Sequence, residues 1–160
     1  RGEQCSACSG TNSSMNKRER LEIEKRARTA LSRLMSCDAV SKRLSVGSTG
    51  PLHEFDIYAE GIVIGGVSTG TYNTSGGNPN TASRDRACAE LLWLSLWPGD
   101  ESRVHVLTDR LLAEWLSTRF NRAPFSRRID IYHYDWELDL ISHVRGIGAE
   151  TKTHTVEAFN

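Results

Sequence analysis

The sequence has no net charge, no long hydrophobic run and few cysteines. Its 160 residues carry 20 basic and 20 acidic side chains, so no overall field would steer it onto nucleic acid or an anionic membrane, and any such binding depends on local patches. No apolar run approaches the roughly 18 residues of a membrane span. We therefore expect no membrane association.

Only four cysteines are present. Cys5 and Cys8 form a C-S-A-C pair, but a zinc site usually needs four ligands and no second pair follows. Cys88 lies in an apolar helical segment, where a small buried side chain is the simpler interpretation. Nothing resembles a disulfide framework, which favours a reducing, cytoplasmic setting.

Several familiar catalytic and binding motifs are also missing. The sequence contains no G-K-[ST] phosphate loop, no spaced glycines of a dinucleotide fingerprint, and no H-E-x-x-H among its five histidines. Ser68 has no G-x-S-x-G context for a serine nucleophile. Evidence for a function therefore has to come from the order of the predicted helices and strands.

The hydrophobic pattern predicts one α/β domain over 16–144, between a flexible arm at 1–15 and a tail at 145–160. Helices are expected over 16–36, over 83–97 with Ser83 as N-cap, and after Asp109. Strands are expected over 52–58, 61–69, 103–109 and 127–134. A hairpin followed by strand–helix–strand units predicts a mixed sheet with helices on both faces.

The stretch "HEFDIYAEGIVIGGVST" suggests a site on the expected hairpin. Residues two apart in a strand share a face, so Glu54 and Asp56 are expected to point the same way. The following strand carries Gly65 and Gly66, which would leave room beside a carboxylate for a metal ion and a phosphate. Hard divalent cations favour carboxylate oxygens and keep several waters.

This stretch, the helix "RDRACAELLWLSLW" and the strand "RVHVLTD" together resemble the PD-(D/E)XK superfamily over residues 17–135. The resemblance implies a restriction-endonuclease-like fold and hydrolysis of phosphodiesters in nucleic acid with magnesium or manganese. It matches Asp56 to the first aspartate of the family. The second acid and the lysine of the family would fall at Gly66 and Ser68, where both are absent.

Side chains from neighbouring helices can replace the missing groups. Arg86 and Glu90 are four residues apart and share a helix face, so Glu90 would be the second acid and Arg86 would hold the phosphate. The predicted catalytic residues are Asp56, Glu90 and Arg86, and the predicted metal ligands are Asp56, Glu54, Glu90 and Glu24. The alternative for Arg86 and Glu90 is a simple surface ion pair.

Nucleic acid, and DNA in particular, is the expected partner. The helix over 16–36 is locally basic, and a cation where the second helix starts suits phosphate binding. The predicted contacts are Arg20, Arg28, Arg43, Ser68 and Arg84. The chain offers no separate recognition module, so we expect a second copy or a partner protein.

Two other interpretations stay open. Loss of the acid and lysine at positions 66 and 68 is compatible with an inactive protein of the same fold that binds nucleic acid or a protein. The loop over 70–81, rich in Gly, Ser, Thr and Asn, is also compatible with a module that binds a small phosphorylated ligand.

Overall fold

The computed structural model describes residues 15–149; the expected N-terminal arm and most of the expected C-terminal tail lie outside them. The chain forms three helices and a six-stranded sheet in this range. The helices are α1 (Lys17–Met35), α2 (Thr81–Leu96) and α3 (Arg110–Arg119). The strands are β1 (Val40–Ser45), β2 (Leu52–Ala59), β3 (Val63–Ser68), β4 (Ser102–Leu107), β5 (Ile129–Asp135) and β6 (Leu140–Ile147).

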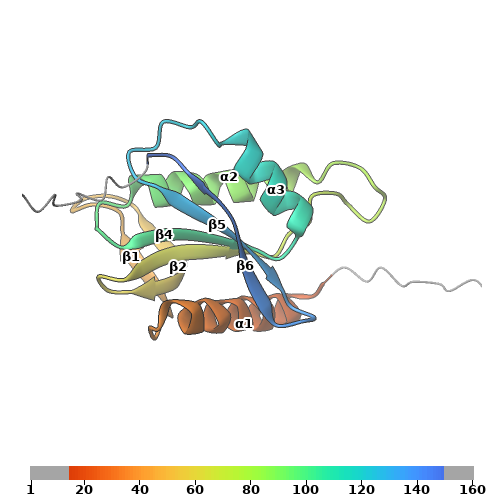
Figure 1. The fold of residues 1–160 in the computed structure, drawn as a ribbon, viewed down its shortest axis with the longest axis horizontal. Helices are drawn as coiled ribbons and strands as arrows, with labels where there is room; N and C mark the ends of the chain where they lie inside the picture. Colours follow the sequence, from red (N-terminus) through yellow and green to blue (C-terminus); the bar gives the residue numbers. More distant parts are fainter. Residues whose placement is uncertain (1–14, 150–160) are drawn as a thin grey trace, which may run out of the picture.

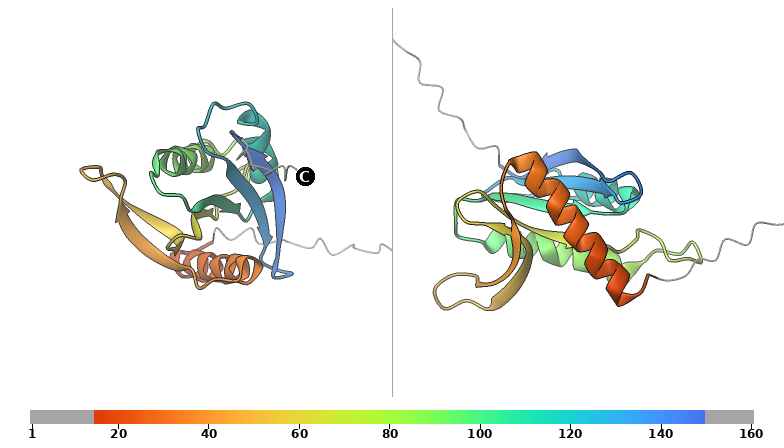
Figure 2. Two further views of the ribbon diagram at one scale, coloured as in Figure 1. Left: turned by 60° about the vertical axis from the view of Figure 1, so that its left-hand side comes forward. Right: turned by 90° about the horizontal axis from the view of Figure 1, so that it is seen from below.

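The sheet is mixed, as the pattern predicts, and its strands lie side by side in chain order. β1, β2 and β3 form an antiparallel meander, β4 and β5 continue parallel to β3, and β6 returns antiparallel to β5. Helix α1 covers one face, and α2 and α3 cover the other (Figures 1 and 2). The crossovers through α2 and α3 make the parallel half of the sheet.

Each face of the sheet has its own hydrophobic core. On the side of α1, buried Ile23, Ala27, Ala30 and Leu31 pack on strand residues such as Val104. On the side of α2 and α3, Leu91, Leu94, Leu112 and Leu116 pack on Phe55, Ile64 and Leu107. Leu34, on α1, lies outside the core on that side and is 54% exposed.

The helix caps are specific. Asn16 and Glu19 form a capping box at the start of α1, with both side chain–backbone bonds 2.9 Å long. Asp109 caps α3, as expected. The prediction for α2 is wrong, because Asn80 is its N-cap and accepts a hydrogen bond from the backbone N–H of Ser83.

Two further differences concern the strands. β6 occupies 140–147, where the pattern predicted the fading end of the domain and a tail. In β2, the register against β1 shifts between the pairs Val40–Tyr58 and Lys42–Phe55, so β2 contains one extra residue there. As a result Phe55 faces α2 whereas Ile57 faces α1, although the two are only two residues apart.

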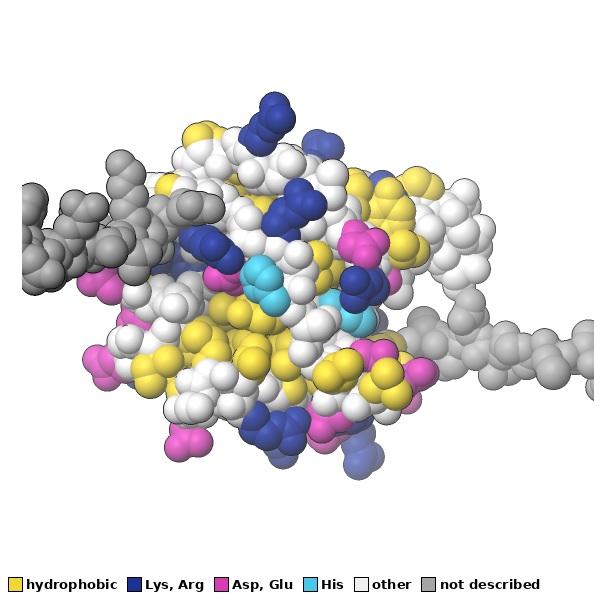
Figure 3. Space-filling model, viewed as in Figure 1, with side chains coloured by type: hydrophobic (Ala, Val, Ile, Leu, Met, Phe, Trp, Pro, Cys, Tyr) yellow, Lys and Arg dark blue, Asp and Glu magenta, His cyan; other side chains and the backbone are white. Residues whose placement is uncertain are grey.

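Among the residues that the structure describes, no helix has the length and apolar character needed to cross a membrane. On the face drawn in Figure 3, lysine and arginine side chains are scattered among acidic and apolar ones rather than gathered in one patch. The neutral composition is therefore matched by a mixed surface on this side.

Candidate functional site

A cavity of about 850 Å³ lies where β2 and β3 separate. The two strands are paired only from Ile57–Gly65 to Ala59–Val63. Beyond that point β2 continues along β1, and β3 continues along β4. The cavity is lined from α1, β2, α2, the end of β3 and the segment after it, including Arg20, Glu24, His53, Ser68, Arg86 and Glu90.

Asp56 bridges the two strands at the point of separation. Its Oδ2 accepts a hydrogen bond of 2.8 Å from the backbone N–H of Val67, a donor that the sheet pairing leaves free. The backbone carbonyl of Asp56 accepts a bond of 2.8 Å from Arg28 Nη1. The Asp56 carboxylate therefore reaches across to β3 at the bulge, and it remains close enough to Glu54 for the charge of Glu54 to raise its pKa.

Burial makes the negative charge of this site costly. Burial, followed by the neighbouring charge of Glu90, raises the pKa of Asp56 to about 6, although the Val67 hydrogen bond opposes this. The pKa of Glu24 is also raised to about 6, by burial and then by the charge of Asp56. Like charges held together in this way favour a proton or a cation.

Glu90 enters the site from α2 and lies against Gly66. A Cβ atom at position 66 would overlap the Glu90 carboxylate and its Cγ carbon. Glu90 Oε2 lies 3.3 Å from His53 Nε2, whereas Glu90 Oε1 is buried and has no hydrogen-bond partner. The carboxylate therefore fills the space that a side chain at position 66 would occupy, and it keeps one oxygen uncommitted.

The other predicted residues divide between the cavity and other surfaces. Arg86 and Arg20 line the cavity, and their Nε atoms donate to the carbonyls of Ala82 and Met15 respectively. No ion pair joins Arg86 to Glu90, and the Glu90 carboxylate instead lies 3.3 Å from His53 Nε2. The simple i, i+4 ion pair considered from the sequence is therefore wrong.

Five predicted residues lie outside the cavity lining, and Asp56 is one of them. Glu54 is exposed and accepts a hydrogen bond of 3.3 Å from Ser41. Arg43 is exposed on the edge strand β1. Arg84 turns toward α3, with its guanidinium 3.8 Å from the Tyr72 ring and 5.4 Å from the Trp115 ring. Arg28 is committed to the Asp56 carbonyl.

Ser68 lines the cavity at the position of the missing lysine. Its hydroxyl lies 2.8 Å from Nε2 of His105, a side chain with no exposed surface. Burial lowers the pKa of His105 to about 4, which keeps the ring neutral near pH 7, and its Nδ1 has no partner. Ser68 therefore belongs to a buried polar pair rather than offering a charge to the cavity.

The sequence reasoning missed His53 and Trp93. Both line the cavity, and their rings are stacked with centroids 4.4 Å apart and planes 11° apart. Their places in the sequence could have identified them, because His53 precedes Asp56 on the same strand and Trp93 lies one turn after Glu90 on α2.

The predicted set of four metal ligands does not form a single group. Within residues 15–149, no three His, Cys, Asp or Glu side chains are placed to hold a metal ion between them. Asp56 and Glu90 do offer hard oxygen donors, one of them buried and unpartnered. Magnesium-type ions take one or two protein carboxylates and fill the rest of their shell with water and substrate oxygens.

Comparisons with protein-family models, with curated proteins and with solved structures found no match to this chain.

Proposed function

We propose that this protein is a metal-dependent phosphodiester hydrolase that acts on nucleic acid, with a restriction-endonuclease-like fold. The observation that carries the proposal is the position of the Glu90 carboxylate against Gly66, next to the strand separation that Asp56 bridges. The resemblance in the sequence requires an acid at position 66, and α2 supplies one there. The element order of helix, antiparallel meander, helix and parallel strand supports the same fold.

In this proposal, Asp56 and Glu90 hold a magnesium or manganese ion, and Glu24 adds negative charge from α1. When bound, the ion would lower the pKa of a coordinated water and stabilise charge on the phosphoryl oxygens. Arg86 and Arg20 approach the cavity from opposite helices and would bind the phosphate oxygens. The cavity walls would hold the scissile bond between these groups.

Cleavage of plasmid and single-stranded DNA in magnesium or manganese tests the proposal. We expect the wild type to cut, and Asp56→Ala and Glu90→Gln to lose at least 100-fold in rate. Arg110→Gln, in an exposed pair with Glu114 outside the cavity lining, is the control and should retain its rate at moderate salt. If chelator-free wild type cuts neither substrate in either metal, catalysis on DNA is excluded.

One observation favours a second candidate, an inactive protein of the same fold that binds nucleic acid. The lysine position holds Ser68, whose hydroxyl is committed to buried His105. Such a protein would bind the same DNA molecules without cutting them, with an affinity that falls as salt rises. The loop that follows β3 also lines the cavity, so adding nucleoside phosphates as competitors tests the small-ligand alternative.

A further inference from the structure

The loop that connects β3 to α2 has two sides with different surroundings. Thr71 and Asn73 line the cavity, whereas Tyr72 between them does not. The Tyr72 ring lies against α3 instead, with its centroid 6.1 Å from that of Trp115. The backbone N–H of Tyr72 donates to the carboxylate of Asp109, the N-cap of α3, so the loop is fixed beside that helix (Figure 1). The loop is therefore a wall between the cavity and the surface of α3.

Two arginines and two aromatic rings meet on the α3 side of this wall. They are Tyr72, Arg84, Trp115 and Arg119, which we call the arginine–aromatic cluster. The Arg84 guanidinium lies 3.8 Å from the Tyr72 ring centroid and 5.4 Å from that of Trp115. The Arg119 guanidinium lies 5.6 Å from the Trp115 ring centroid. Arg119 is exposed and the other three residues are partly exposed, so all four reach the surface.

The positive charge of the arginine–aromatic cluster is not neutralised by neighbouring acids. Neither Arg84 nor Arg119 forms an ion pair with any residue that the structure describes. The acidic side chains of α3 and its cap are already engaged. Asp109 accepts hydrogen bonds from two backbone N–H groups, and Glu114 pairs with Arg110 at 3.0 Å. Two cations held at one ring repel each other, and a bound anion would relieve this repulsion.

Single-stranded nucleic acid is the ligand whose chemistry matches this combination. Guanidinium groups bind phosphate oxygens through paired donors. Aromatic rings stack on unpaired bases whatever their sequence, whereas the bases of a duplex are already stacked on each other. Leu111 is 56% exposed and lies one turn before Trp115 on the same face of α3, so it extends the apolar surface beside the ring. Charge and stacking together favour a single strand over a duplex.

We propose that the arginine–aromatic cluster binds a single strand of nucleic acid where it leaves the cavity, an inference that rests on nucleic acid being the substrate of the proposed function. Arg84 and Arg119 bind phosphates of this strand, and Trp115 stacks on one of its bases. Tyr72 orients Arg84 and connects the cluster to the cavity wall. Arg86 lies on the cavity side of the same helix, so α2 would contact the strand on both sides of the wall.

Fluorescence anisotropy with labelled oligo(dT), in a buffer that contains a chelator, tests binding without cleavage. We expect Arg119→Gln to weaken binding by about 3–10-fold at moderate salt and to reduce the slope of log K against log salt by about 0.7. Arg110→Gln is the matched control, because it removes the same charge from the same helix where Glu114 already neutralises it.

The stacking role is tested with the same probe. Trp115→Leu should weaken oligo(dT) binding by about 5–100-fold, because leucine fills space but offers no aromatic face. Trp115→Phe should restore most of the affinity. Trp136→Leu is the control, since Trp136 is 40% exposed in the turn between β5 and β6, where its carbonyl accepts from Arg26 of α1. Thermal unfolding of each variant distinguishes lost binding from lost folding.

The outcomes separate the two proposals. If the wild type cuts DNA and Asp56→Ala does not, while Arg119→Gln and Trp115→Leu bind and cut as the wild type does, the role of the cluster falls and the proposed function stands. If the wild type binds oligo(dT) through the cluster but cuts nothing, hydrolysis falls and the cluster stands as a binding surface. The inference is overturned if the wild type does not bind oligo(dT), or if these variants lose as much affinity for blunt duplex DNA.

Discussion

The Glu90 carboxylate lies against Gly66, in the space that a side chain at position 66 would fill. Glu90 is on α2, and Gly66 is on β3. The contact is possible only because position 66 has no Cβ. A glycine in this strand is therefore the counterpart of an acidic side chain that arrives from the neighbouring helix.

This relationship predicts different outcomes for two adjacent glycines. In Gly66→Ala, the new methyl group meets the end of a flexible side chain, so Glu90 should move aside at a cost of about 1 kcal/mol or less. In Gly65→Ala, it meets the backbone carbonyl and side chain of Val104 on β4, which cannot move aside, and we expect a loss of about 2–4 kcal/mol. Urea unfolding measures both.

Cleavage assays on the same two proteins complete this prediction. Gly66→Ala should fold normally and lose at least tenfold in DNA cleavage, because Glu90 no longer occupies its place. Equal destabilisation by the two substitutions would mean that Glu90 is fixed as rigidly as the backbone of β4.

The sequence pattern predicted the layers of helices and sheet, but it did not predict the details of the site. Periodicity located α1, the hairpin, α2, β4, α3 and β5, because their apolar faces are long and regular. It missed β6, whose residues alternate poorly and which is an edge strand exposed along much of its length. We expected the Glu90 side chain to lie near position 66, because a helix that follows a hairpin packs on the strand before it.

The bulge in β2 is a feature of the site that the sequence pattern did not predict. One extra residue reverses which face of the sheet a side chain occupies. It puts Ile57 on the α1 side although Phe55 is on the α2 side, and the Asp56 carboxylate between them accepts its hydrogen bond from Val67. The pairing of His53 with Glu90, 37 residues apart, likewise depends on packing and not on local pattern.

The cap of α2 gives a second prediction. Asn80 accepts a hydrogen bond of 3.2 Å from Ser83 N, and its backbone N–H donates to the Tyr72 carbonyl at 3.0 Å. Asn80→Ala should therefore destabilise the protein by about 1 kcal/mol. Ser83→Ala, at the position that the sequence favoured as cap, should cost about 0.5 kcal/mol or less. Thermal unfolding would contradict the assignment if Ser83→Ala were the more costly change.

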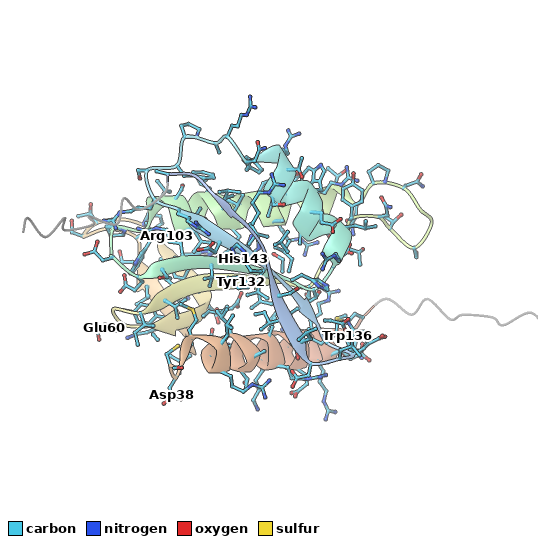
Figure 4. The ribbon with its side chains drawn as sticks, viewed as in Figure 1. Asp38, Glu60, Arg103, Tyr132, Trp136 and His143 are labelled. Carbon is cyan, nitrogen blue, oxygen red and sulfur yellow. The ribbon has the colours of Figure 1, made fainter. Side chains whose placement is uncertain are left out.

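Arg103 gives a third prediction. This buried side chain donates hydrogen bonds to four backbone carbonyls. It lies at the C-terminal end of α2, away from the loop that connects β3 to α2 (Figure 4). These carbonyls belong to Leu94, Trp97, Gly99 and Glu101. Lysine cannot reproduce the planar fork of donors, so Arg103→Lys should lower the free energy of unfolding by about 2–4 kcal/mol. Arg127→Lys, in an exposed pair with Asp100, should cost under about 1 kcal/mol. Similar losses in the two variants, measured by urea unfolding, would rule out this role for Arg103.

The pKa of Asp56 gives the fourth prediction, on how stability depends on pH. A carboxyl whose pKa rises on folding binds its proton more tightly in the folded state. The stability that this supplies is present below the ordinary value of 3.8 and is lost as pH rises to about 6. Each tenfold change in proton affinity is worth about 1.4 kcal/mol. Asp56→Asn should therefore raise the free energy of unfolding by about 1–3 kcal/mol at pH 7.5, while keeping an oxygen to accept from Val67 N–H.

Urea unfolding of wild type and Asp56→Asn across pH 3.5–7.5, without divalent ions, checks this prediction. The difference between the two proteins should grow as pH rises from about 4 to 6 and stay constant above that range. Added magnesium should then stabilise the wild type at pH 7.5 and leave Asp56→Asn nearly unchanged, because the ion offsets the charge that the variant lacks. A wild type that magnesium does not stabilise would argue against Asp56 as a metal ligand, while the pH dependence alone would still identify a carboxylate held at an energetic cost between β2 and β3.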